Sequence, residues 1–314
     1  MKWLDEIVSG GGWSPWPRTR IEVRGRDAKS VLHNFCTNHI EKLEAGSGCE
    51  AFFLNVKGKI VGFANVLQRQ DSLVIETAVD QYERLVQQLD RYVISEDVTF
   101  VNLAEKESQL LVIGSQGLKS IGVASGELCP LHELQVSLAD TDVRVIGLPW
   151  SSNCAALIQF DRRREEAVND VLNQLAFSPL TEEQVELVRV ASGYPIFERD
   201  LTEDNLPQEM DRDHLAIDFQ KGCYLGQETV ARIDAMGHVN RTLVGIVSPQ
   251  PGELLGSDLT SDGKVVGSIS SAVTSATDGI TIGLALVRRG SNQPGQKLNS
   301  AVGEVEVKSL PMDL

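Results

Sequence analysis

The residues best suited to chemistry lie in one short stretch, Lys221 to Glu228, which reads KGCYLGQE. Cys223 follows a lysine and precedes QETVARIDAM, a segment of helical composition that ends at Gly237. We therefore expect Cys223 on a loop that leads into the amino end of a helix. Unpaired N–H groups and partial positive charge at a helix start, together with Lys221, favour the thiolate form of a nearby cysteine. The pattern predicts a nucleophilic or redox-active thiol.

The neighbours of Cys223 extend this prediction to a ligand site. Gly222 and Gly226 have no side chains, so the backbone there can approach a bound group closely. Tyr224 is expected to stack on the ligand or line its pocket, although a place in the core explains this residue equally well.

The polar residues of the predicted helix start are expected to order that start and to contact a ligand. They are Gln227, Glu228 and Arg232, and an ordinary surface ion pair between the last two is the simpler alternative.

A purely structural role is also the alternative for Cys223 itself. A single cysteine on a turn is most often a small, partly buried apolar residue, and no histidine or second cysteine at fixed spacing supplies a base.

Composition places the chain among globular proteins and disfavours several classes of function. It has 314 residues, enough for two domains, and 42% of them are hydrophobic. Acidic residues outnumber basic ones by 44 to 29, and a net charge of -15 repels a phosphate backbone, so no nucleic-acid binding is expected.

Cysteine and histidine spacing predicts no metal site. The five cysteines are odd in number and form no CxxC, which disfavours a disulfide framework and a zinc site. His33 and His39 lie six residues apart on one predicted helix, so they should not share a face. Reduced thiols, and the lack of a signal peptide or a long apolar run, predict a cytoplasmic protein without membrane association.

Periodicity predicts an α+β region over residues 1–240 and an all-β barrel over 241–314. Within the first region, strands flank the Lys57-Gly58 turn, and with a following helix they suggest a split βαβ subdomain over about 49–105. Ile217 and Phe219 are expected to end a strand just before Cys223. Helices are predicted at residues 25–40, 79–94, 164–176, 227–236 and, after a capping box from Thr181 to Gln184, up to Gly193. A short helix and a Pro-rich connector are expected around Trp3, Trp13 and Trp16.

With its surroundings, KGCYLGQE resembles the signature of the YgfZ family, folate-binding relatives of the glycine-cleavage T-protein. The resemblance includes GRDAKSVLHNFCTN (25–38), RVASGYPIFERDLTEDNLPQE (189–209) and VARIDAMGHVNRTL (230–243), and it spans most of the chain. It implies a T-protein-like folate-binding fold with a ferredoxin-like subdomain, followed by a C-terminal β-barrel.

The resemblance also implies a cofactor and partners. Tetrahydrofolate or a derivative would lie in a central channel near Cys223, and iron–sulfur enzymes or their assembly machinery would be the partners of a monomeric protein. The residues implied in the folate site are Arg189, Lys221, Gly222, Tyr224, Gly226, Gln227, Glu228 and Arg232.

Two departures from T-proteins limit the implied chemistry. Val61 and Gly62 stand where T-proteins place an acidic residue that assists aminomethyl transfer, and Ala191 stands where a second acidic residue holds the pterin. A neutral residue cannot make the paired hydrogen bonds of a carboxylate. The leading hypothesis is therefore an accessory factor for iron–sulfur enzymes rather than a classical enzyme. The alternatives are a tetrahydrofolate-dependent aminomethyl or one-carbon transferase and a non-catalytic protein-interaction module.

Overall fold

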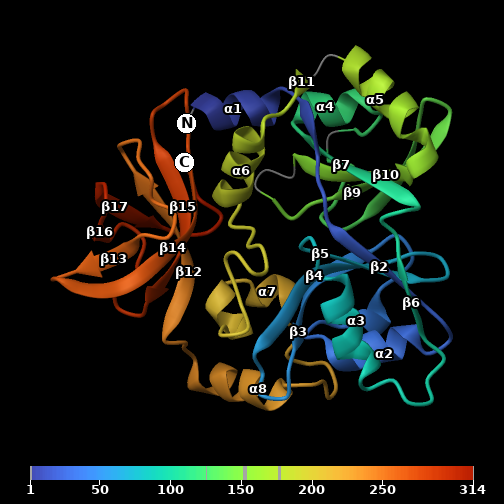
Figure 1. Cartoon of the computed structure of the whole chain (residues 1–314), viewed down its shortest axis with the longest axis horizontal. Helices are drawn as coiled ribbons and strands as arrows, with labels where there is room; N and C mark the ends of the chain where they lie inside the picture. The colour runs from blue at the N-terminus through green and yellow to red at the C-terminus, as the bar shows by residue number, and fades with distance from the viewer. Residues whose placement is uncertain (1, 125, 151–153, 176–177, 314) are drawn as a thin grey trace.

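The computed structural model describes residues 2–124, 126–150, 154–175 and 178–313. Its strands form a five-stranded sheet, a six-stranded sheet and a closed barrel, arranged around a common centre (Figure 1). The helices are α1 (Lys2–Ser9), α2 (Ala28–Phe35), α3 (Tyr82–Asp90), α4 (Ser115–Ser120), α5 (Glu165–Gln174), α6 (Glu182–Ala191), α7 (Asp213–Ala216) and α8 (Gln227–Met236). Short 3-10 turns occupy Ile40–Lys42, Arg162–Arg164 and Pro207–Met210.

The five-stranded sheet carries the subdomain expected around residues 49–105. In spatial order its strands are β3 (Gly48–Leu54), β4 (Ile60–Gln68), β5 (Leu73–Thr77), β2 (Thr19–Arg24) and β6 (Thr99–Asn102). Leu32 of α2 and Leu85 of α3 pack with Ile21 and Ile75 of the sheet in one buried cluster. Since β2 pairs between β5 and β6, this sheet also takes in residues well upstream of position 49.

The six-stranded sheet forms the second body, at the upper right of Figure 1. In spatial order its strands are β11 (Ser178–Pro179), β1 (Gly12–Pro15), β7 (Glu107–Ile113), β10 (Ala155–Asp161), β9 (Thr141–Gly147) and β8 (Glu133–Leu138). Leu118 of α4 and Leu172 of α5 pack against Val112 and Ile158 of this sheet. Burial of such side chains stabilises the body by about 1.5–3 kcal/mol each.

The C-terminal barrel is closed and antiparallel, as the alternating sequence pattern predicts. Its strands are β12 (Arg241–Ser248), β13 (Asp258–Ser261), β14 (Lys264–Thr274), β15 (Thr281–Arg288), β16 (Lys297–Ser300) and β17 (Gly303–Lys308). The expected order of an α+β body followed by an all-β barrel is confirmed.

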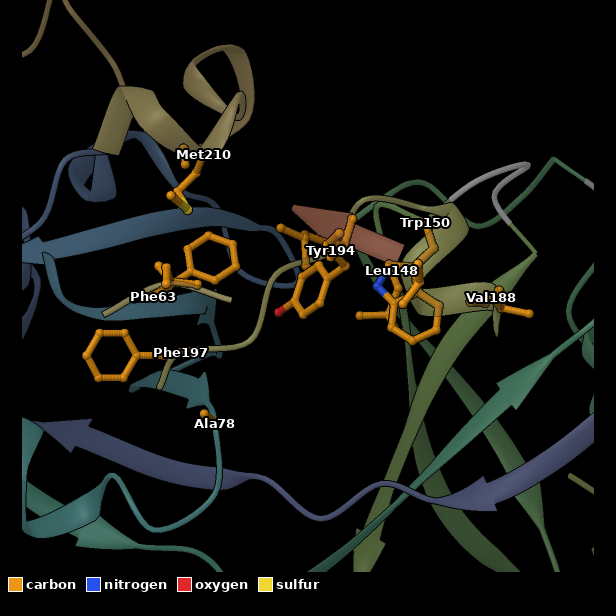
Figure 2. Packing of buried hydrophobic residues seen from close by; sticks show 14 of the residues in the cluster. Phe63, Ala78, Leu148, Trp150, Val188, Tyr194, Phe197 and Met210 are labelled. Carbon is orange, nitrogen blue, oxygen red and sulfur yellow. The ribbon is translucent and has the colours of Figure 1, made fainter. Parts of the chain in front are cut away.

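One buried cluster joins the three bodies. Figure 2 shows Phe63 of β4, Trp150, Tyr194, Phe197 and Met210 converging at the centre. The Phe63 and Tyr194 ring centroids lie 5.6 Å apart, and those of Trp150 and Tyr194 lie 5.8 Å apart. Such aromatic contacts add to the energy of apolar burial, so the bodies share a core.

Two local predictions have different outcomes. The capping box is confirmed, because the Thr181 hydroxyl accepts from the Gln184 N–H at 3.2 Å and the Gln184 side chain accepts from the Thr181 N–H at 2.9 Å. The helix predicted over 25–40 is wrong beyond Phe35. There Cys36 turns to extended backbone and forms a β-bridge with Phe53, so strand pairing replaces the helical pattern.

The strand predicted to end at Ile217 and Phe219 is also wrong. Helix α7 ends at Ala216, and both residues lie on the loop that follows it. Phe219 is 43% exposed, so its apolar side chain does not mark a buried strand. Within the described residues, no helix has the length and apolar character needed to cross a membrane.

Candidate functional site

The signature loop, residues 221–226, joins α7 to α8 and presents Cys223 at the surface. The Leu225 N–H donates to the Asn34 carbonyl at 3.0 Å, which fixes the loop to α2. Gly226 has φ +81°, and a Cβ there would lie 2.6 Å from the Asn55 carbonyl oxygen. Glycine is therefore required at 226 for the close approach to the β3–β4 hairpin.

Cys223 differs in its surroundings from most other thiols of the chain. Burial raises the pKa of the Cys36, Cys49 and Cys154 thiols, which keeps them protonated at neutral pH. Cys129 and Cys223 are exposed. These two thiols are therefore the most accessible to reagents and partner molecules.

Lys221 anchors the loop from inside the protein. It is 5% exposed, and its Nζ donates to the carbonyls of His33, Cys36 and Asn38 at 2.5, 2.8 and 2.7 Å. Burial lowers the pKa of Lys221. An ammonium has three protons to donate, so these carbonyls use its full capacity. They belong to the C-terminal end of α2 and the turn after it, where the helix dipole favours a cation.

Replacing Lys221 by methionine will destabilise the protein by about 2–4 kcal/mol, because buried carbonyls lose their donor. The measurement is urea unfolding. Lys59→Met is the matched control, since the exposed Lys59 Nζ donates to a single carbonyl, that of Asp204. We expect that control to lose less than about 1 kcal/mol. Equal losses in the two variants would contradict the anchoring role.

The remaining signature residues occupy different environments. Tyr224 is 8% exposed, with its ring centroid 4.9 Å from the Lys221 Nζ, and burial raises its pKa. A Cβ at Gly222 would meet open space. Gln227 is half-buried in the first turn of α8, whereas Glu228 and Arg232 are exposed and form no ion pair with each other.

His33 and His39 lie side by side, contrary to the expectation from their spacing. Their ring centroids are 4.5 Å apart, because the chain turns back after Cys36 to pair with β3. Burial and the nearby Lys221 lower the pKa of His33, which favours its neutral form. The Nδ1 atoms of both rings are buried without a hydrogen-bond partner in the described part of the chain.

A cavity of about 300 Å³ lies between the segments around Pro130 and Trp150, the stretch from Ser192 to Leu215 and the C-terminal Leu310 and Pro311, and we call it the tail-side cavity. Trp150, Ser192, Gly193, Arg212, His214 and Pro311 are among the residues that line it. Its volume is at the lower end of the range for small-molecule sites. The described lining contains no residue of the signature loop.

Asn38 connects this cavity to the signature loop. Its Nδ2 donates to the carbonyl of the cavity-lining Leu215 at 2.8 Å, and its own carbonyl accepts from the Lys221 Nζ at 2.7 Å. The adjacent Thr37 hydroxyl donates to the Ala216 carbonyl at 2.6 Å. The cavity wall and the anchor of the cysteine loop are therefore separated by a single residue.

Asp211 supplies a carboxylate to the lining of the tail-side cavity, whereas Ala191 is not among the described lining residues. Ala191 is fully buried, and its carbonyl accepts from the Met312 N–H at 2.8 Å. Arg212 provides a charge in the lining, but its Nε donates to the Glu50 carboxylate at 2.7 Å. Arg212 is therefore held as one half of a buried ion pair.

Arg189 does not reach a ligand in this arrangement. It is 0% exposed, and its donors serve Glu186, Asp200, Ser271 and the Tyr194 carbonyl. Each of its three guanidinium nitrogens is engaged, so the residue links α6 to the barrel. These contacts give Arg189 a structural role, and its place in the folate site stays a prediction.

The sequence reasoning missed the cavity residues Trp150 and Arg212. Arg212 and its partner Glu50 are 162 residues apart, so no short motif contains both. In the sequence alone, nothing next to Arg212 indicates that this charged side chain is buried.

Comparison with known proteins identifies the family. Residues 241–312 match the glycine cleavage T-protein C-terminal barrel domain. The chain is 27% identical to the tRNA-modifying protein YgfZ of Blochmanniella pennsylvanica over 72% of this chain and 68% of that protein. It is 25% identical to the protein of that name from Aliivibrio fischeri over 90% and 87% of the two chains. These matches support a YgfZ-family, glycine-cleavage T-protein-like protein.

The expected T-protein-like fold of this YgfZ-family chain is also confirmed. The glycine cleavage system aminomethyltransferase T from Bartonella henselae matches 99% of this chain and 88% of its own, with a TM-score of 0.83 at 16% identity. A chloroplastic protein of Arabidopsis thaliana is 24% identical over 91% of this chain, which spans 66% of that relative.

Proposed function

We propose that this YgfZ-family protein binds a folate and supports the assembly or repair of iron–sulfur enzymes, with Cys223 as its reactive thiol. One observation carries the proposal: an exposed thiol lies on a loop whose buried anchor, Lys221, contacts the wall residue of a cavity through Asn38. A ligand in that cavity is thus placed to influence the loop.

The tail-side cavity is the folate site in this proposal. The Trp150 indole offers an apolar face for a pterin, and Ser192 and Gly193 also line the cavity. The apolar Val61, which is 7% exposed, provides no carboxylate for aminomethyl transfer, and Ala191 provides none to hold the pterin. These features favour folate binding without T-protein chemistry.

The names of the relatives connect the family to tRNA modification. A chain with net charge -15 is unsuited to holding tRNA directly. We propose that the link is indirect and that the partners are iron–sulfur enzymes that modify tRNA.

Tetrahydrofolate is expected to raise the melting temperature of the protein, because a ligand that binds only the folded state stabilises it by mass action. At one hundred times the dissociation constant the gain is about 2.7 kcal/mol, or roughly 5 °C for a chain of this size. Differential scanning fluorimetry measures the shift. Lack of any shift at millimolar tetrahydrofolate would reject the folate part of the proposal.

A pair of histidine variants locates the site. His214 lines the tail-side cavity, whereas His238 is an exposed histidine just beyond α8. His214→Ala should reduce the tetrahydrofolate-induced shift, and His238→Ala should leave it unchanged. An unchanged shift in His214→Ala would place folate elsewhere.

A further inference from the structure

Asp211 is the accessible acidic group of the tail-side cavity. Among the described lining residues it is the only one with a carboxylate, and it is exposed, so a ligand in the cavity can reach it. The neighbouring Arg212 does not neutralise it. The Arg212 Nε donates to Glu50 at 2.7 Å and its Nη1 donates to the Gly193 carbonyl at 3.2 Å, so this cation is used inside the protein.

The Asp211 carboxylate has its acceptor sites open. In the part of the chain that the structure describes, its side chain forms no hydrogen bond and no ion pair. Partial burial raises the pKa of Asp211, while the nearby His214 and Arg212 act in the opposite direction. An ionised carboxylate has about four acceptor positions, and none of them is used by a described donor of the protein. A ligand with N–H groups would therefore meet an acceptor that has no competing partner.

The backbone holds Asp211 in place before any ligand arrives. The residue follows the 3-10 turn Pro207–Met210 and has φ +55° and ψ +35°, a left-handed conformation that few residues other than glycine adopt. The residues on either side are buried, because Met210 is 0% exposed and Arg212 is 5% exposed. Asp211 is thus fixed between two anchored neighbours, which lowers the entropy cost of binding through its side chain.

The lining selects the kind of group that Asp211 would bind. A carboxylate accepts two parallel hydrogen bonds from a planar group that carries adjacent N–H donors. The 2-amino group and the N3–H of a pterin form such an edge. Trp150 lines the same cavity and offers a flat apolar surface for the ring. A planar heterocycle with paired donors fits both the carboxylate and the indole.

We propose that Asp211 orients the pterin in the tail-side cavity and replaces the carboxylate that Ala191 does not provide. This inference rests on the proposed function, because it takes the tail-side cavity as the folate site. Asp211 is a positioning residue in this arrangement. It accepts hydrogen bonds from the pterin edge and takes no part in bond making or breaking.

Pterin and lumazine form a matched pair of probes for this edge. Lumazine carries a carbonyl where pterin carries the 2-amino group, so an acceptor would face the Asp211 carboxylate. Calorimetry with the natural protein should show pterin binding at least about tenfold tighter than lumazine. In Asp211→Asn the side-chain amide donates as well as accepts, so the preference for pterin should fall below about threefold. Equal binding of the two probes by the natural protein would overturn the proposal.

A second pair of measurements uses tetrahydrofolate itself. Asp211→Asn should weaken its binding at least about tenfold, because hydrogen bonds to a charged group are lost. Asparagine tolerates the left-handed conformation as aspartate does, so the backbone is retained. Asp213→Asn is the matched control. It removes a carboxylate two residues later that is not in the described lining, and it should bind within about twofold of the natural protein. Equal weakening in the two variants would indicate a general charge effect and reject the role of Asp211.

The outcomes separate this inference from the proposed function. A tetrahydrofolate-induced shift that is lost in His214→Ala but kept in Asp211→Asn would leave folate in the cavity and overturn the role of Asp211. Absence of a shift in the natural protein would reject folate binding and this inference with it. Loss of the shift in both variants, with Asp213→Asn unchanged, is the expected result.

Discussion

Cys223→Ser is expected to fold as the natural protein does and to leave iron–sulfur enzyme activity at the background level of a cell that lacks this protein. Cys223 is exposed, so the change from sulfur to oxygen should alter the free energy of unfolding by less than about 0.5 kcal/mol. A serine hydroxyl is a far weaker nucleophile than a cysteine sulfur and cannot take part in thiol redox chemistry. The measurements are complementation of the deletion strain and thermal unfolding of the purified variant.

Cys129→Ser is the matched control for this experiment. Cys129 is the other exposed thiol, and it lies directly before Pro130, far from Cys223 in the sequence. The control should restore enzyme activity fully. Full rescue by Cys223→Ser would exclude a chemical role for the thiol, whereas loss of rescue in both variants would point to a general sensitivity of exposed cysteines.

Arg189→Met is expected to produce the largest loss of stability among single substitutions, about 3–5 kcal/mol. The Arg189 Nη1 donates to Asp200 at 2.9 Å, and both side chains are 0% exposed. Removal of the cation leaves the Asp200 carboxylate buried without its counter-charge. The same substitution also disconnects α6 from Ser271 of the barrel. Denaturant unfolding measures the loss.

Arg199→Met controls for the loss of a charge near α6. Arg199 contacts the same Glu186 carboxylate as Arg189 does, but its side chain is 39% exposed. A solvated pair of this kind contributes about 1 kcal/mol or less. A similar loss in the two variants would show that burial of Arg189 is not what stabilises the junction between α6 and the barrel.

Local features of the fold were predictable because neighbours in sequence create them. The capping box at Thr181 and Gln184 satisfies N–H groups within one helical turn, and it appears in the structure as expected. Gly226 and Gly237 mark the ends of α8 with positive φ, a conformation that glycine adopts without strain. The alternation after Arg241 predicts the barrel strands for the same reason, since side chains of a strand point alternately to its two faces.

Features that depend on distant partners were not predictable in this way. The strand expected at Ile217 and Phe219 is a loop, because strand formation needs a pairing neighbour and not only apolar residues. His33 and His39 lie side by side because Cys36 forms a β-bridge with Phe53 of β3. A helical spacing rule cannot predict this bridge.

By itself, the sequence determined the family resemblance, the order of the α+β body and the barrel, and the position of Cys223 on a loop before a helix. Only the tertiary structure decided the role of Lys221, whose three acceptors lie 183 to 188 residues away, and the burial of Arg189. It alone decided the tail-side cavity, because the walls of that cavity come from segments far apart in the sequence. The physical reason is that caps and turns are satisfied within a few residues, whereas buried charges and cavities take their environment from whichever segments the packed core brings together.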